Sequence, residues 1–209
     1  MMKIETLPCM GDFGTNAYIV SSSENALLID APCDPEYILE KLGGKKLLAI
    51  LLTHGHVDHI SAAEEIRIAT GCKVYISEND KMMLSDPESS LASYFSLPLN
   101  KCTVCECFKD GDTLTFGDME FKAIETPGHT PGSSCFVIDK VIFSGDTLFR
   151  NSIGRDFGWS CYKNIIKSIK KLYDLGGNYK VYPGHDGDTE LYDELMFNPY
   201  LGELKEIID

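Results

Sequence analysis

One short segment, THGHVDHI at residues 53–60, constrains this chain more than any other. It directly follows KLLAILL at residues 46–52, an apolar run that predicts a buried strand. Imidazole nitrogen and carboxylate oxygen are ligands that suit zinc, iron or manganese, and a turn after a strand can aim alternate side chains into one cavity. A lone histidine could simply belong to a polar turn in solvent, but that alternative explains a cluster of such residues poorly. The candidate metal ligands in the segment are His54, His56, Asp58 and His59.

The other two of the five histidines also follow predicted strands. His129 stands in ETPGHTPGS and His185 in VYPGHDGD, each directly after Pro-Gly. Pro-Gly predicts a tight turn at a sheet edge, where a rigid scaffold can position a functional side chain. Asp146, in VIFSGDTLF, ends another apolar strand, which is a costly place for an unpaired carboxylate. Five histidines and two aspartates at strand ends therefore predict a binuclear metal site.

Charge excludes several classes of partner. The chain has 19 Lys and Arg against 32 Asp and Glu, a net charge of −13, which disfavours both the phosphate backbone of nucleic acids and anionic membrane surfaces. The N-terminus, MMKIETLPCMG, has no apolar signal-peptide core, and no run approaches the roughly 18 to 20 apolar residues of a membrane span. We therefore expect a cytoplasmic protein that acts on a small molecule. The sequence gives no indication of the oligomeric state.

The length and the layout of the chain predict a single domain over residues 1–209. No Gly/Ser-rich or Pro-rich linker divides the sequence, and its composition, 44% hydrophobic and 24% charged, is typical of a globular protein. A mixed α/β architecture of this length commonly forms one core.

Turn residues and periodicity predict strand blocks that are each followed by helices, an order that indicates two sheets packed face to face with helices outside. In the first half, we expect strands at 3–8, 15–21, 25–30, 46–52 and 73–76, and helices at 34–42 and 56–70. In the second half, we expect strands in DTLTFG, MEFKAIETPGH, SSCFVID and VIFSGDTLF, a helix at 163–175, a strand at 180–182, and one or two helices over 190–208 with a break near Pro199.

Two stretches allow more than one interpretation. Residues 78–99 mix Ser with Leu, Tyr and Phe, and they fit a helical surface insertion and a lid over a substrate equally well. Most of the eight cysteines are scattered singly in apolar strands, where free Cys behaves as a small hydrophobic residue. CTVCEC at 102–107 could hold a soft metal or form a redox pair through Cys102, Cys105 or Cys107, but it lacks the second CxxC of a zinc ribbon. Thiols on a surface strand are therefore the favoured interpretation.

Together these motifs resemble the metallo-β-lactamase superfamily. The resemblance rests on HxHxDH at 54–59, His129 after TPG, Asp146 in SGDT and His185 after PG, and it runs nearly the full chain. It implies an α+β fold, the four-layer αββα sandwich of two mixed β-sheets with outer helices and the site at one edge. The ligand sets that it implies are His54, His56 and His129 for a first metal, Asp58, His59 and His185 for a second, and Asp146 as a bridge between them.

Within that superfamily, TPGHTPGS, SGDTLF and the Gly-Arg turn at 154–155 are similar to the glyoxalase II-like hydrolases, which cleave thioesters such as S-lactoylglutathione. By this resemblance, Arg155 would help to hold the thiol part of the substrate and Phe157 would line the same pocket. Two features depart from the pattern. The sequence ends soon after NPY at 198–200, without the helical region that completes the glutathione site of glyoxalase II, and Asp186 replaces the usual Gly after His185. The thiol and the acyl group therefore stay open.

The expected reaction is hydrolysis of a thioester by a hydroxide shared between two divalent ions, with zinc expected and iron or manganese as alternatives. The metal charge would stabilise the oxyanion, and a thiolate leaves without a separate general acid. Asp58 and Asp146 are the candidate catalytic carboxylates, and each is first a ligand. Asp30, at the end of NALLID, could accept a hydrogen bond from a ligand imidazole or simply end its strand.

Other activities occur on the same fold, and the motifs of this chain rank them below hydrolysis of a thioester. A persulfide dioxygenase resembles this family but uses one iron held by two His and one Asp, so a complete second ligand set favours hydrolysis. True β-lactamases usually depart from HxHxDH at the last His, and lactonases tend to carry other motifs. Flavodiiron proteins have an acidic residue where His56 stands, and nucleases need a basic groove. A scaffold with a relict site is disfavoured because all seven ligands are present.

Overall fold

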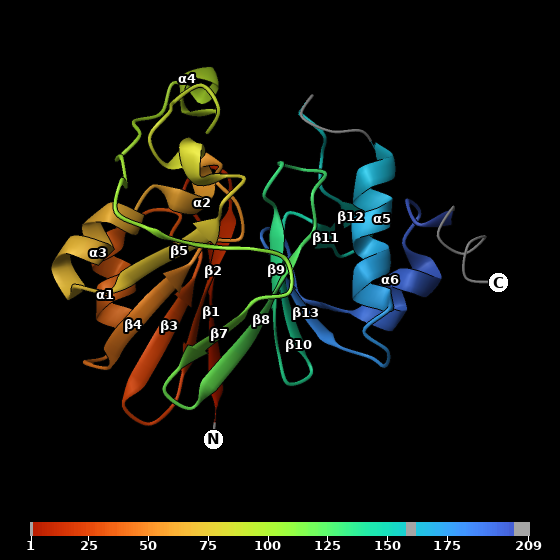
Figure 1. The fold of residues 1–209 in the computed structure, drawn as a ribbon, viewed down its shortest axis with the longest axis horizontal. Coiled ribbons are helices and arrows are strands. Elements are labelled where there is room, and N and C mark those ends of the chain that lie inside the picture. The colour runs from red at the N-terminus through yellow and green to blue at the C-terminus, as the bar shows by residue number, and fades with distance from the viewer. Residues whose placement is uncertain (1, 158–161, 203–209) are drawn as a thin grey trace.

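The computed structural model of the chain describes residues 2–157 and 162–202. Two six-stranded sheets face each other and helices cover the outer side of each, so the molecule has four layers in the order αββα (Figure 1). This arrangement confirms the predicted α+β sandwich of two mixed sheets. The single-domain organisation over residues 1–209 stays a prediction.

The first sheet has the strand order β1-β2-β3-β4-β5-β6. Its first two pairings are antiparallel and its last three are parallel. The strands are Lys3–Met10 (β1), Thr15–Ser21 (β2), Asn25–Ile29 (β3), Lys46–Leu51 (β4), Lys73–Ser77 (β5) and Glu106–Phe108 (β6). The helices on this side of the molecule are Pro35–Lys41 (α1), Val57–Ile60 (α2), Ala63–Thr70 (α3) and Ala92–Phe95 (α4), with a 3-10 turn at Lys81–Leu84 (η1) (Figure 1).

The second sheet has the strand order β14-β13-β10-β9-β8-β7, and β10 pairs with β13 in parallel while the other pairings are antiparallel. The strands are Thr113–Phe116 (β7), Met119–Glu125 (β8), Ser134–Ile138 (β9), Val141–Gly145 (β10), Lys180–Pro183 (β13) and Thr189–Glu190 (β14). A small hairpin, Leu148–Phe149 (β11) with Ser152–Ile153 (β12), stands apart from this sheet. The outer helices are Tyr162–Tyr173 (α5) and Leu191–Phe197 (α6) (Figure 1).

The inner strands β2 and β3 of the first sheet are buried on both faces. In β3, Ala26 and Leu28 belong to the core on the side of α1 and α3, whereas Leu27 and Ile29 belong to the core between the sheets. Side chains alternate along a strand, so a strand that is covered on both faces is apolar at every position. This burial explains why the segments NALLID and KLLAILL are continuous apolar runs.

Several predicted elements differ from the structure, most clearly near the cluster of ligands. The helix expected over 56–70 is two helices, because the backbone at the break bonds to the loop after β3: Ala31 N–H donates to the carbonyl of His59, and Ala62 N–H donates to the carbonyl of Ala31. The strand expected through VIFSGDTLF ends at Gly145, which places Asp146 in the turn before β11.

Two further expectations concern the cysteines and the C-terminus. Six cysteines within the described residues are free thiols. Cys102 is buried in the core on the side of α3, so its expected place at the surface was wrong, while Cys107 is exposed on β6. The helix expected from 190 ends at Phe197, before Pro199, and residues 203–208 lie outside the described part of the chain. None of the helices in the described residues has the length and the apolar character that a membrane span needs.

The core between the sheets gives a first prediction, on stability. Phe136 on β9 is fully buried there, and its ring lies edge-on to that of Phe108 with centroids 5.4 Å apart. Replacing Phe136 by Ala removes these contacts and leaves a cavity, so we expect the free energy of unfolding to fall by about 3–5 kcal/mol in urea titrations. Phe197→Ala is the control, because Phe197 is 71% exposed and should change the value by less than about 0.5 kcal/mol. Equal losses in the two variants would contradict this assignment of the core.

Candidate metal centre

The predicted ligands all lie at one edge of the sandwich, in loops that follow the ends of strands. His54 and His56 follow β4, and the short helix α2 that comes next carries Asp58 and His59. The remaining ligands follow the ends of β8, β10 and β13, and they are His129, Asp146 and His185. Segments far apart in sequence therefore meet at this edge because strands from both sheets end there.

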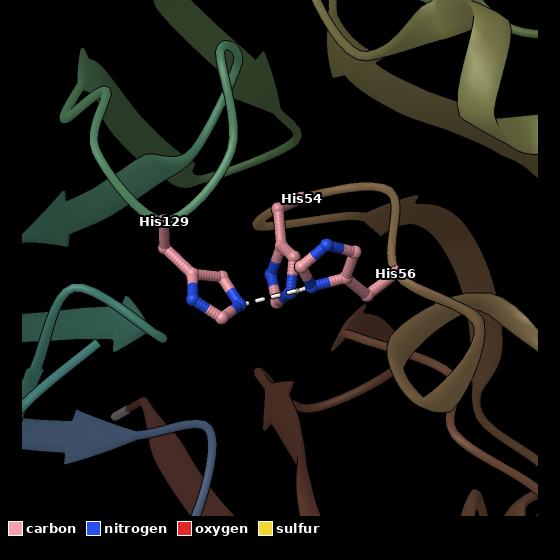
Figure 2. A group of neighbouring side chains, drawn as sticks. All are labelled: His54, His56 and His129. Carbon is pink, nitrogen blue, oxygen red and sulfur yellow. Dashed lines mark hydrogen bonds between the residues drawn. The ribbon is translucent and has the colours of Figure 1, made fainter. Parts of the chain in front are cut away.

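Three imidazoles form the first group of donors. His54 Nε2 lies 3.1 Å from His56 Nδ1, and His56 Nδ1 lies 2.9 Å from His129 Nε2. Figure 2 shows the three rings converging on one point, with His54 and His56 on one loop and His129 opposite them. All three side chains are buried, and their donor atoms lie within 4.8 Å of one another. This is a set of nitrogen ligands of the kind that holds a transition-metal ion.

The second group joins Asp58, His59 and His185. The Nε2 atoms of His59 and His185 lie 3.5 Å and 3.4 Å from Asp58 Oδ2. Asp146 lies between the groups: its Oδ1 is 3.3 Å from His59 Nε2, while its Oδ2 is 3.3 Å from His129 Nε2 and 3.4 Å from His185 Nε2. The structure therefore brings all seven predicted ligands together, and Asp146 contacts residues of both groups.

Two ligand imidazoles are oriented by backbone carbonyls. His129 Nδ1 lies 2.7 Å from the carbonyl oxygen of Arg155, and His185 Nδ1 lies 3.2 Å from that of Phe13. A carbonyl can only accept, so Nδ1 carries a proton in both rings, and Nε2 is the nitrogen that faces the site and can ligate a metal ion when it is unprotonated. The sequence predicted a substrate contact for the side chain of Arg155, but not this role for its backbone carbonyl.

A buried carboxylate orients His59 and, through a threonine, His54. Asp30 Oδ2 accepts from His59 Nδ1 at 2.8 Å, and the two carboxylate oxygens also accept from the backbone N–H and the hydroxyl of Thr53, each at 2.8 Å. The Thr53 oxygen in turn lies 3.1 Å from His54 Nδ1, placed to accept its proton. Asp30 thus accepts a hydrogen bond from a ligand imidazole. This is the first of the two roles that the sequence allows for it, the other being only to end its strand.

Three buried side-chain atoms of the cluster, among them His56 Nε2, have no hydrogen-bond partner in the described structure. His59 Nε2 and Asp146 Oδ1 are both buried and unpaired, although they lie 3.3 Å apart. Buried polar atoms without partners carry a desolvation cost, and a cation held between them removes it. The residues present therefore fit a divalent metal ion, and the mixed nitrogen and oxygen donors suit zinc, iron or manganese.

The two groups differ in protonation. Burial, with the neighbouring imidazoles, holds the pKa of His54 well below its usual range and lowers that of His56 to about 3, so these two rings of the first group are neutral and have free lone pairs. Burial also acts to lower the pKa of His185 and His59, but the carboxylates around them outweigh it. Asp146 and Asp58 raise the pKa of His185 to about 10, and Asp58 and Asp146 raise that of His59 well above its usual value. The second group therefore holds protons that a metal ion must displace.

One carboxylate beside the site was not predicted. Asp80 is fully buried, and its three hydrogen bonds reach both loops that carry the first group. Its Oδ2 accepts from Gly55 N–H at 3.1 Å and from the Thr130 hydroxyl at 2.6 Å, and its Oδ1 accepts from Gly132 N–H at 2.6 Å. A Cβ at Gly132 would lie 2.7 Å from this carboxylate, so only glycine permits the approach. Asp80 follows the end of β5, a position shared with the ligands, and that shared position is the signal that could have revealed it.

A cavity of about 620 Å³ opens onto the cluster. Arg155 and Phe157, both predicted as substrate contacts, line it, and the ring of Phe157 lies 5.4 Å from that of His56. Leu91 and Phe95 also line it. The segment 78–99 therefore borders the cavity, as a lid would, while its opening and closing stays a prediction.

Comparison with known proteins decides the family. The model of the metallo-beta-lactamase superfamily matches residues 10–195, which is most of the chain. The chain belongs to the metallo-β-lactamase superfamily. Among its solved members, the B3 metallo-beta-lactamase BLEG-1 is 31% identical, with a TM-score of 0.90 over 96% of this chain and 100% of the other.

Two further superfamily members are similar over nearly the whole chain. The protein TTHA1623, solved in a di-iron-bound form, is 34% identical with a TM-score of 0.84, over 93% of this chain and 100% of the other. The hydroxyacylglutathione hydrolase GloC of Haemophilus influenzae is 31% identical over 96% of this chain and 98% of its own length. Together with the cluster of His and Asp donors, the family supports a metal-dependent hydrolase that binds divalent metal ions at this site.

The hydrogen bonds of Asp80 to the two ligand loops lead to a prediction about metal affinity. Asp80→Asn keeps the size of the side chain but turns one accepting oxygen into a donor that faces other donors, so both ligand loops lose support. We expect metal affinity, measured by competition with a chromophoric chelator, to fall by about 10- to 100-fold. Thr130→Val removes one of the three donors and should cost less. Wild-type affinity in Asp80→Asn would show that this carboxylate does not position the ligands.

The protonation of the second group leads to a prediction about pH. Because His59 and His185 carry protons at neutral pH, metal binding at this group should release about two protons near pH 7 and weaken as the pH falls. Calorimetric titration of the metal-free protein with the metal ion, in two buffers with different ionisation enthalpies, gives the number of protons released on binding. His185→Asn, which cannot be protonated there, should reduce the number by about one. A count near zero in the wild-type protein would contradict the assigned protonation.

Proposed function

We propose that this protein is a binuclear metal-dependent hydrolase that cleaves a small thioester to an acid and a thiol. The observation that carries the proposal is the position of Asp146. Its two oxygens lie within 3.4 Å of Nε2 atoms from His59, His129 and His185, which belong to different donor groups. A carboxylate in that position is suited to bridge two ions.

In this proposal, His54, His56 and His129 hold one ion and Asp58, His59 and His185 hold the other. Two divalent ions at such a site supply hydroxide at neutral pH and polarise a carbonyl group. The protein contributes fixed ligand geometry, since the outer nitrogens of four ligand rings are anchored by Thr53, Asp30, Arg155 and Phe13. Zinc is the proposed metal, and the di-iron form of TTHA1623 makes iron the main alternative.

A thioester is the proposed substrate class for a chemical reason. A thiolate leaves without being protonated, whereas the amine released from a β-lactam needs a proton. All five histidines of the chain are among the proposed ligands, so none is left as a dedicated proton donor. Arg155 lines the cavity and can attract the carboxylates of a thiol such as glutathione.

The comparison with GloC supports a glutathione thioester in particular. Sequence similarity to glyoxalase II left the thiol open, because the helical region that completes its glutathione site was not expected here. GloC is named a hydroxyacylglutathione hydrolase, and the alignment spans 98% of its length. A relative that aligns with this chain over almost its whole length is thus named a hydroxyacylglutathione hydrolase. S-lactoylglutathione is therefore the first substrate to test.

Hydrolysis of a β-lactam is the second candidate, because BLEG-1 is named a B3 metallo-beta-lactamase. The need for a proton at the leaving nitrogen ranks it below the thioester. The persulfide dioxygenase alternative needs one iron with two His and one Asp. The convergence of Asp58, His59 and His185 on one point favours the hydrolase over it.

Metal analysis and a substrate panel test this proposal. The purified protein should hold about two zinc or iron ions and cleave S-lactoylglutathione faster than a lactone, a β-lactam or, with oxygen, glutathione persulfide. Asp146→Ala and His54→Ala should each lower kcat/KM by more than about a hundredfold with bound metal reduced. Asp118→Asn, an exposed carboxylate in the turn between β7 and β8 that lies outside the cavity and both donor groups, is the matched control and should stay near wild type. Unchanged turnover in Asp146→Ala, or no thioester cleavage by metal-loaded wild type, would refute the proposal.

A further inference from the structure

A second, smaller cavity of about 230 Å³ adjoins the metal centre. Phe13 and Asp58 line both cavities, so the two meet beside a ligand of the second donor group. The smaller cavity lies between the β1–β2 turn, the loop after β3 and the stretch after α4. Its apolar lining comes from these three segments and consists of Met10, Phe13, Pro32, Cys33, Leu97 and Pro98.

We propose that this second cavity binds a short, uncharged acyl group of the thioester, while the thiol part occupies the larger cavity. The inference rests on the proposed function. A thioester carbonyl that faces the metal ligands extends in two directions, one along the acyl carbon and one along the sulfur. The larger cavity is lined by Arg155 and suits a bulky polar thiol, whereas the smaller one offers apolar walls of limited volume.

The charges around the second cavity exclude an anionic acyl group. Asp12 and Asp58 both line it, and a carboxylate on the acyl chain would be repelled by them. Cys33 adds no charge, because burial, with Asp34 and Asp12, raises the pKa of its thiol. At about 30 Å³ for a water-sized group, the volume holds on the order of five to eight non-hydrogen atoms. The fitting group is therefore a short aliphatic acyl chain.

Phe13 forms the boundary between the two cavities and is tied to the metal centre. Its carbonyl accepts from His185 Nδ1 at 3.2 Å, and its ring packs edge-on against Phe95 with centroids 4.7 Å apart. Phe95 belongs to α4, and Leu97 follows it directly, so the segment 78–99 supplies a wall to each cavity. The position of the acyl cavity relative to the ligands is thus fixed by one hydrogen bond and one ring contact.

A series of thioesters that share one thiol tests the inference. With zinc-loaded protein and the acetyl, butyryl and hexanoyl thioesters of N-acetylcysteamine, we expect kcat/KM to rise by about fourfold for each added methylene up to the capacity of the cavity. Leu97→Trp fills the cavity and should abolish the rise while the acetyl thioester is still cleaved. Ser93→Trp adds the same ring at an exposed position on α4 and should leave the rise unchanged.

The outcomes separate the two proposals. Cleavage of all three thioesters with the same dependence on chain length in wild type and Leu97→Trp would overturn the acyl cavity and leave the thioester hydrolase standing. Cleavage of none of them, nor of S-lactoylglutathione, by metal-loaded wild type would overturn the proposed function itself.

A second measurement does not depend on turnover. Cys33 lines the acyl cavity and Cys107 is exposed on β6, far along the chain from it, so the two thiols serve as probe and internal control. Hexanoate is the product acid of the hexanoyl thioester. It should slow the alkylation of Cys33 by iodoacetamide about threefold or more and leave the alkylation of Cys107 unchanged, with both rates measured by mass spectrometry. Hexanedioate, with its second carboxylate, should protect Cys33 less. An alkylation rate of Cys33 that hexanoate does not change would overturn the inference.

Discussion

The structure depends on the convergence of seven nitrogen and oxygen donors at one edge of two packed sheets. Such a cluster is unfavourable by itself, because it buries His59 Nε2 and Asp146 Oδ1 without hydrogen-bond partners. The fold tolerates this cost because every ligand is fixed by a loop at the end of a strand in a rigid core. Cations that enter the cluster remove the cost, so metal binding and the stability of this edge are coupled.

Two buried carboxylates that are not proposed ligands hold this edge in place. Asp30 joins the end of β3 to Thr53 and His59 within the first sheet. Asp80 joins Gly55 to the loop of the second sheet that carries His129. Each accepts hydrogen bonds through both of its oxygens, which offsets the desolvation of a charge in the interior. The first donor group is therefore assembled from both sheets through Asp80, and the geometry of His54, His56 and His129 follows from how the sheets pack.

The sequence predicted the sandwich and the grouping of the ligands because both leave local patterns. NALLID is apolar throughout since both faces of β3 are covered, and His54, His56, Asp58 and His59 stand together after one strand. The break between α2 and α3 could not be predicted in this way, because it arises from backbone bonds between Ala31 and the helix ends, a contact with no local pattern. The contacts of Asp80 were not predicted either, because its three partners lie 25 to 52 positions away in the chain, and its place after the end of β5 was the one local signal for it.

Substrate specificity depends on residues other than those that form the metal centre. The ligands form one fixed constellation, and proteins can share such a constellation without sharing a substrate. The walls of the two cavities come instead from the β1–β2 turn, the segment around α4 and the loop around Arg155, and Phe13 of the first segment contacts Phe95 of the second. Substitutions in these walls change which acyl group and which thiol fit, while the anchors of the ligand rings stay intact. The substrate is therefore decided by side chains such as Leu97 that have no part in holding the metal, and a comparison of the ligands alone cannot distinguish a thioester hydrolase from a β-lactamase on this fold.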